Sequence, residues 1–172
     1  KKEVNEYEQS LKQQFGERQR LLRDLLIDSF RMRPDSLGPL HTYNPSDHEG
    51  SYRLLGQQVR DALESLQKGA HEQIKEIRQS ARNMLSPEIL SGLPPEDRDS
   101  ATTDMRQVEE EAISIEDVMA KQFLELSNTA AGSVDSIDPD VLRAKARAVL
   151  TTVEPLAKLI VRVQSLRRLL QE

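Results

Sequence analysis

The chain has 172 residues with a formal net charge of −5, and 31% of its residues are charged while only 3% are aromatic. It contains no tryptophan and no cysteine. A core must therefore be built from aliphatic side chains, which favours helices over sheets. The acidic balance argues against nucleic-acid binding, because contact with phosphates needs a cationic surface. The absence of cysteine excludes disulfides and thiolate metal sites.

The first predicted helix covers residues 2–31, and a polar connector at 32–50 follows it. Apolar residues recur three, four or seven positions apart, which places them on one face of an α-helix. They are Val4, Tyr7, Leu11, Phe15, Leu22, Leu26 and Phe30. The connector contains three prolines and Gly38, which oppose helix formation. Ser46 and Glu49 have the spacing of a capping box for the next helix.

The second predicted helix covers residues 51–85 and ends before Pro87, because the residue before a proline disfavours helical geometry. Its apolar stripe consists of Leu55, Val59, Ala62, Leu66, Ala70, Ile74, Ile77, Ala81 and Met84. Gly56 and Gly69 each weaken the helix by roughly 1 kcal/mol relative to alanine. We expect these glycines to mark a close helix approach or a bend.

The third predicted helix covers residues 103–131, with Asp97 as an alternative start and Gly132 as the stop signal. Its stripe consists of Met105, Val108, Ala112, Ile115, Met119, Phe123, Leu126 and Ala130. The alternation of three and four positions between these residues is typical of a bundle helix.

The fourth predicted helix covers residues 139–171 and begins after Asp138, a typical N-cap residue. Its stripe consists of Leu142, Ala146, Val149, Val153, Leu156, Ile160, Val163 and Leu170. Pro155 lies inside this helix and should kink it, because proline lacks a backbone N–H. Beyond the kink, the apolar face shifts toward Leu159, Leu166 and Leu170.

Together these segments predict an all-α fold, an elongated antiparallel bundle of four long helices with helix four kinked at Pro155. The length suits a single domain over residues 1–172. The chain begins with Lys1 rather than methionine, so we expect a fragment of a longer protein.

Few residues suggest chemistry, and we expect no catalytic residue, no cofactor and no metal site. His41 and His48 lie in the connector without the fixed spacing that a metal site needs. His71 lies within a predicted helix, so a histidine phosphocarrier domain stays open as an alternative function. The acidic run Glu109–Glu111 has no Glu-x-x-His partner of the kind found in di-iron bundles. We therefore interpret this run as a solvated helix face.

The strongest functional signal is the excess of leucine after Pro155. The leucines there occupy more than the roughly 100° arc that a surface helix needs for its own core. Such an excess indicates an interaction surface. Two LxxLL patterns occur, at 22–26 and 166–170, and such patterns can dock as short helices. The candidate partner-binding residues are Leu159, Arg162, Leu166, Leu169 and Leu170.

We therefore expect a non-enzymatic interaction or scaffold domain of a multi-subunit assembly, located inside the cell, in the cytoplasm or the nucleus. Its partner is another protein, in particular a helical one, or a second copy of the chain. The alternative is a peripheral membrane-surface bundle, because the fourth helix is rich in basic residues. These are Arg143, Lys145, Arg147, Lys158, Arg162, Arg167 and Arg168. No stretch approaches the roughly 18 apolar residues of a membrane span.

Overall fold

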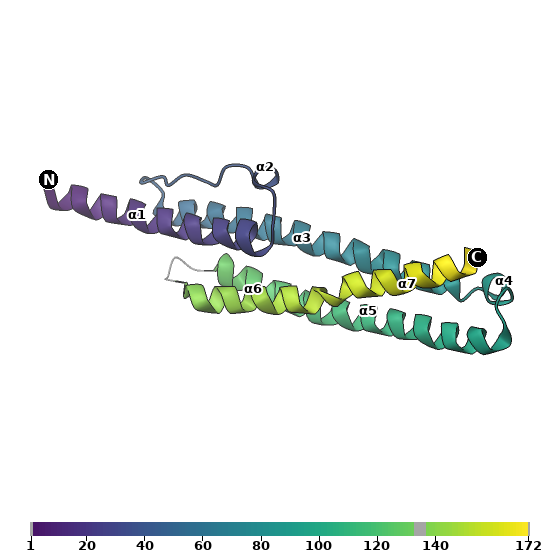
Figure 1. Ribbon diagram of the computed structural model, residues 1–172. Coiled ribbons are helices and arrows are strands. Elements are labelled where there is room, and N and C mark those ends of the chain that lie inside the picture. The colour runs from purple at the N-terminus through teal and green to yellow at the C-terminus, as the bar shows by residue number, and fades with distance from the viewer. Residues whose placement is uncertain (1, 133–136, 172) are drawn as a thin grey trace. The chain divides into compact units, whose positions relative to one another are not determined.

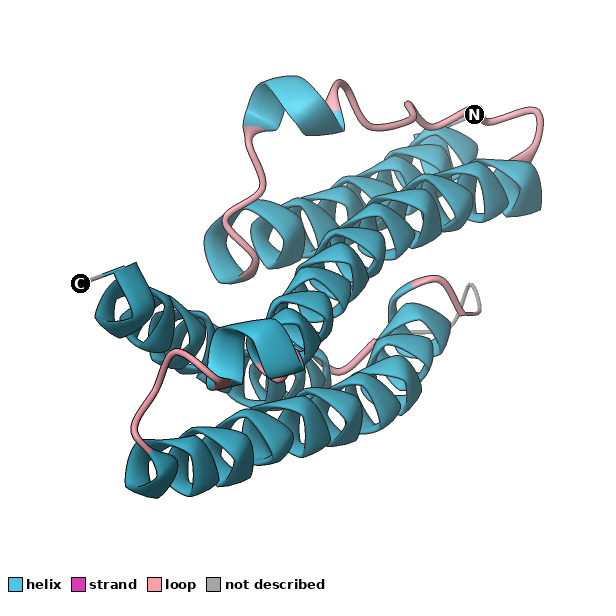
Figure 2. Ribbon diagram, turned by 90° about the vertical axis from the view of Figure 1, so that its right-hand side faces the viewer, coloured by secondary structure: helices cyan, strands magenta, loops and turns pink. Residues whose placement is uncertain are grey.

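The computed structural model describes residues 2–132 and 137–171 (Figure 1). Every regular element in these two ranges is helical (Figure 2), which confirms the predicted all-α bundle. The elements are α1 (Lys2–Asp24), the π-helix η1 (Leu25–Ser29), α2 (Pro34–Leu37), α3 (His48–Met84), α4 (Pro87–Leu90), α5 (Pro95–Ala130), α6 (Pro139–Val153) and α7 (Pro155–Gln171).

The chain forms two compact units, and the long helices α3 and α5 contribute to both. Unit 1 comprises Lys1–Leu66 and Gln122–Leu150. It contains α1, η1, α2, the first half of α3, the end of α5 and most of α6. Its core is largely aliphatic, as the composition predicts. The buried side chains are Phe15, Leu22, Leu25, Leu26, Leu55, Val59, Leu63, Phe123, Leu126, Ala130, Leu142, Ala146 and Val149.

The end of the first helix is wound more loosely than the sequence pattern predicts. Regular α-helix ends at Asp24, and the π-helix η1 continues to Ser29, with the Phe30 N–H donating to the carbonyl of Leu25 at 3.2 Å. This winding keeps both Leu25 and Leu26 buried. Arg31 then adopts a φ of 59°, the left-handed conformation that terminates many helices.

The connector between η1 and α3 is irregular apart from the short helix α2, yet it is attached to its neighbours. The side chain of Gln58 donates to the carbonyl of Pro39 at 2.8 Å and accepts from the His41 N–H at 3.1 Å. Gln19 donates to the carbonyl of His41. Tyr43 packs on Phe15, with 5.3 Å between ring centroids, and α1 and α3 therefore hold the connector from both sides.

The first turn of α3 is capped by Asp47 rather than by Ser46. The Asp47 carboxylate accepts from the Gly50 N–H at 2.9 Å, which satisfies a donor that the helix itself leaves free. A Cβ on Gly50 would lie 2.0 Å from that carboxylate, so the glycine leaves room for the cap. The helix consequently begins at His48, before the expected residue 51.

Unit 2 comprises Gln67–Lys121 and Thr151–Glu172. Within the described residues it contains three long helical segments, from α3, α5 and α7, and the short helix α4. The buried apolar side chains of this unit are Ile74, Ile77, Ala81, Met84, Ala101, Met105, Val108, Ala112, Met119, Leu156, Leu159 and Val163.

The helix α5 begins at Pro95, earlier than the expected residue 103. Proline suits the first helical position because its missing N–H would have no helical partner there, and Glu96 and Asp97 favour the positive end of the helix dipole. Arg98 also holds the preceding turn, donating to the carbonyls of Leu93 at 2.8 Å and Ser91 at 3.1 Å. Polar residues thus begin this helix before its apolar stripe starts.

The kink predicted at Pro155 is confirmed, and it takes the form of a break between two helices. The helix α6 ends at Val153, Glu154 forms a turn, and α7 begins at Pro155. Proline at the start of α7 needs no hydrogen-bond acceptor for its nitrogen.

Candidate functional site

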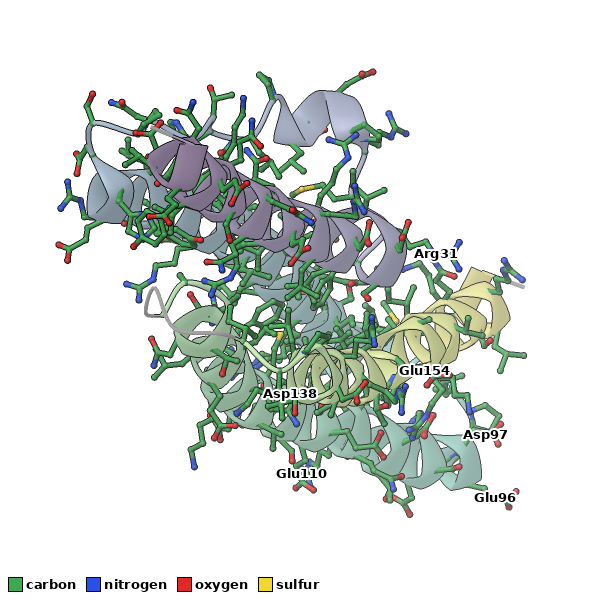
Figure 3. The ribbon with its side chains drawn as sticks, turned by 90° about the vertical axis from the view of Figure 1, so that its left-hand side faces the viewer. Arg31, Glu96, Asp97, Glu110, Asp138 and Glu154 are labelled. Carbon is green, nitrogen blue, oxygen red and sulfur yellow. The ribbon has the colours of Figure 1, made fainter. Side chains whose placement is uncertain are left out.

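A groove with a volume of about 1120 Å³ lies in unit 2, between the first turns of α5 and the second half of α7. Its α7 wall is mostly apolar, with Val161, Leu166 and Leu169 beside Arg162 and Ser165. Its α5 wall includes three acidic residues, listed here as Asp97, Asp99 and Asp104. Figure 3 shows Asp97 on the side of α5 that is nearer to α7, and Glu96 on the opposite side.

The apolar wall exposes large side chains to solvent. Val161 is 58% exposed and Leu169 is 63% exposed, although both lie on a helix whose opposite face is buried. Leu166 is half-buried between them. Solvated apolar side chains that line a groove are a common mark of an interaction site.

The five predicted binding residues fall into three environments. Arg162, Leu166 and Leu169 line the groove. Leu170 is half-buried and is not among the residues that line it. Leu159 is 1% exposed and belongs to the core of unit 2, because it shares the face of α7 that carries Leu156 and Val163. At this exposure it offers almost no surface to a partner.

Arg162 joins the two walls of the groove. Its guanidinium donates to the Asp104 carboxylate and to the side-chain oxygen of Gln107 at 3.3 Å, and it lies 3.6 Å from a carboxylate oxygen of Glu111. Figure 1 shows that α5 begins at the end where α7 finishes, so the two helices run antiparallel and Arg162 bridges them. Two carboxylates surround one guanidinium, so this part of the groove keeps a net negative charge.

Four other charged residues at the start of α5 and on α7 form no ion pair within the described part of the chain. Asp97 and Asp99 on α5 are exposed, and so are Lys158 and Arg168 on α7. None of the four takes part in a side-chain hydrogen bond or salt bridge among the described residues. Within the two described ranges, the start of α5 thus carries unpaired acidic groups that line the groove, and α7 carries unpaired basic groups outside the groove lining.

The apolar wall was predicted from the sequence, whereas the acidic wall was not. The run Pro94-Pro95-Glu96-Asp97 carries the signal for a helix start, but the polar residues after it have no apolar periodicity. Only the antiparallel register of α5 and α7 brings Asp97 and Asp99 beside the leucines that follow Pro155.

His71, the centre of the phosphocarrier alternative, is exposed on α3 and contacts a carboxylate. Its Nδ1 lies 2.9 Å from an oxygen of Glu116, and Arg78 lies 3.8 Å from the other oxygen of the same group. His48 bonds instead to the hydroxyl of Tyr43 at 2.8 Å. Among the described residues, no group of three or more histidine, aspartate or glutamate side chains is arranged to hold a metal ion.

The acidic run on α5 has no common target. Glu109 lies 2.5 Å from Arg82 of α3, whereas Glu111 faces Arg162 of α7. Glu110 lies between them and is exposed to solvent, as Figure 3 shows. The three consecutive glutamates thus point in different directions around the helix, as their spacing predicts.

The two LxxLL patterns differ in exposure. Leu22, Leu25 and Leu26 are at most 3% exposed and form part of the core of unit 1, so the first pattern arises from core spacing. In the second pattern, Leu169 projects into the groove region while Leu166 and Leu170 are half-buried. Only the second copy is accessible.

The basic residues considered for membrane binding are partly neutralised. Arg143 lies 3.2 Å from Asp140, and Lys145 lies 4.0 Å from Glu125. Arg162 is engaged with the acidic wall of the groove. Across the described helices, none has both the length and the apolar character that crossing a bilayer requires.

Comparisons of this chain with protein-family models, with curated proteins and with solved structures find no match. A proposal for the function of this chain therefore rests on the geometry and chemistry of its own residues.

Proposed function

We propose that this chain is a non-enzymatic protein-interaction domain that accepts a partner helix in the groove between α5 and α7. The observation that carries the proposal is the incomplete packing of unit 2. Within the described residues, unit 1 gathers four long helical segments, from α1, α3, α5 and α6, whereas unit 2 gathers three. A helix bound in the groove would give unit 2 a fourth, a number typical of stable bundles.

The dimensions of the groove suit a helix. Val161 and Leu169 are eight positions apart on α7, a rise of about 12 Å or a little over two helical turns. A partner helix of two to three turns would cover both side chains. Full burial of such side chains contributes roughly 1.5–3 kcal/mol each, before the cost of association is subtracted.

The chemistry of the groove favours a partner with two kinds of residue. An apolar stripe would cover Val161, Leu166 and Leu169, and basic residues beside it would face Asp97 and Asp99. Charge pairs at the rim of such an interface contribute more to specificity and association rate than to affinity. We further propose that the domain is a scaffold subunit of an intracellular assembly, held through helix packing.

Site-specific photo-crosslinking tests the proposal. A benzoylphenylalanine side chain replaces Val161 in the chain produced in its native cell, and Lys68, an exposed position on α3, carries the same group in the control. We expect a crosslink from position 161 to a helical segment of one protein, identified by mass spectrometry, and no such product from position 68. Equal products at both positions, or none at position 161, would overturn the proposal.

A matched pair of substitutions tests whether the apolar wall is responsible. Leu169 is 63% exposed in the groove region, and Leu124 is 62% exposed on a part of α5 that belongs to unit 1. We expect Leu169→Glu to abolish the crosslink at position 161 and Leu124→Glu to leave it unchanged. The helical circular dichroism of both variants should match that of the original chain, since neither side chain is in the core.

A further inference from the structure

We propose that the helix occupying the groove is α7 of a second copy of this chain, so that the domain forms a dimer with twofold symmetry. This inference rests on the proposed function and names its partner. In a twofold dimer, the same surface serves both copies and must be complementary to itself. The region around α7 carries an apolar row and complementary charged groups, and a self-complementary surface needs both.

The apolar part is a ridge of three residues on α7. Val161, Ser165 and Leu169 are spaced four positions apart, so they form a continuous row along the helix, and all three line the groove. The small side chain of Ser165 lies at the midpoint, where two antiparallel helices can approach closely. A twofold axis at Ser165 makes Val161 of each copy level with Leu169 of the other. Both exposed side chains then become covered.

The same alignment of the two α7 helices also brings opposite charges together. Because α5 and α7 run antiparallel, the first turn of α5 lies at the end of α7 that carries Leu169. Lys158 precedes Val161 by three positions, and in the dimer it extends toward Asp97 and Asp99 of the second copy. Its charge meets acidic groups that have no ion pair among the described residues of their own chain.

A second charge contact lies on the other side of Ser165. Arg168 and Arg162 are each three positions from Ser165, so Arg168 of one copy becomes level with Arg162 of the other. Arg162 already contacts Asp104 and Glu111, which together carry one negative charge more than this guanidinium neutralises. Arg168 supplies the missing positive charge. Basic groups from one copy thus meet acidic groups from the other at both ends of the contact.

Disulfide formation tests the position of the axis. The chain contains no cysteine, so Ser165→Cys introduces a single thiol that meets its own copy at the axis. Disulfide formation needs Cβ atoms roughly 3.5–4.5 Å apart. We expect rapid conversion of Ser165→Cys to a covalent dimer under mild oxidation, and a rate about tenfold or more lower for the exposed control Lys68→Cys. Equal rates for the two variants would rule out the axis.

Sedimentation equilibrium tests the apolar ridge. The original chain should be a dimer, and Leu169→Glu should raise its dissociation constant by about 100-fold or more, because a charge would be buried against Val161 of the second copy. The control Leu124→Glu should leave the dissociation constant within about threefold. A chain that remains monomeric at every concentration contradicts the inference.

A charge exchange tests the register. One variant carries Asp97→Lys and Asp99→Lys, the other carries Lys158→Glu, and both keep Arg168 and its contact unchanged. Each alone should dimerise about tenfold or more weakly than the original chain, because like charges meet. Their equimolar mixture should form a heterodimer close to the original in affinity, since both charge contacts are then complementary. A mixture no tighter than the separate variants contradicts the register.

The results of sedimentation and crosslinking together distinguish a failure of the dimer inference from a failure of the proposed function. A monomeric chain whose position 161 crosslinks to a different protein refutes the dimer and supports the interaction domain. A monomeric chain without any crosslink at position 161 refutes both.

Discussion

At the scale of single residues, Leu159 and Leu169 show why one helix can carry both core and surface. Both are leucines in the same apolar-rich segment, and their exposed fractions are 1% and 63%. The sequence pattern offered both as binding residues, because the excess of leucine leaves the direction of the helix core ambiguous. Only packing against α3 and α5 decides which face is buried.

The two leucines should respond differently to truncation. We expect Leu159→Ala to lower the free energy of unfolding by about 2–5 kcal/mol, because it removes buried methyl groups and leaves a cavity. Leu169→Ala should change it by less than about 0.5 kcal/mol. Urea denaturation checks both, at a concentration where sedimentation shows the chain to be monomeric. Similar losses for the two variants would contradict the assignment of Leu159 to the core alone.

Ionisation of the Tyr52 phenol should make the stability of the folded chain depend on pH. Burial raises the pKa of Tyr52 above its ordinary value of 10.0, while the nearby Arg18 lowers the pKa and Tyr43 raises it. The unfolded chain therefore loses this proton at a lower pH than the folded chain. The stabilisation is fully present below about pH 10 and is lost as the pH rises through the folded pKa.

Replacing the phenol removes this contribution. We expect Tyr52→Phe to show a smaller loss of unfolding free energy between pH 9 and pH 11 than the original chain, measured by urea denaturation. The contact of the ring with Phe15, at 5.0 Å between centroids, is retained in this variant. An equal pH dependence in both chains would mean that Tyr52 is not responsible.

At the scale of elements, the apolar stripes predicted the long helices and their order, whereas the helix starts depended on polar contacts. The start of α5 at Pro95 requires the side chain of Arg98 to hold the preceding turn. The start of α3 depends on the Asp47 cap and on the space at Gly50. Periodicity does not report such contacts, so the sequence located helix interiors better than helix ends.

Gly56 and Gly69, in the interior of α3, have opposite surroundings. A Cβ on Gly69 would meet no atom within 4 Å, whereas a Cβ on Gly56 would lie 3.2 Å from the carbonyl oxygen of Ala131. We expect Gly69→Ala to raise the free energy of unfolding by about 0.5–1 kcal/mol, because alanine restricts the unfolded chain and favours helix. Gly56→Ala should raise the free energy of unfolding by less, or lower it, because Ala131 must move to make room for the added methyl group.

Thermal unfolding of the two alanine variants, monitored by circular dichroism, measures the difference. A gain at Gly56 equal to that at Gly69 would show that the approach of Ala131 imposes no constraint on α3.

At the scale of the whole molecule, the all-α bundle could be predicted because its core is a sum of local stripes. The division into two units could not be predicted, because α3 and α5 show no break in pattern where the units divide. The candidate site, likewise, could be predicted only in part. Its apolar wall comes from one helix and was visible in the sequence, whereas its acidic wall comes from a distant segment.

Hydrogen exchange can show whether the two units open separately. Leu159→Ala weakens the core of unit 2, so we expect faster exchange for amides of residues 74–84 and 105–119 than in the original chain. Amides of residues 15–26, which belong to unit 1, should change much less if the units open as separate cooperative segments. Equal acceleration in both sets would show that the chain unfolds as one cooperative unit.

The tethered connector between η1 and α3 has a consequence for proteases. Irregular surface segments are the usual sites of limited cleavage, because a protease must draw an extended strand into its active site. Here Gln58 and Gln19 hold the segment around His41 against two helices, and Tyr43 packs on Phe15. Chymotrypsin should therefore cut after Tyr43 slowly, and Gln58→Ala should make the same bond a preferred site of cleavage.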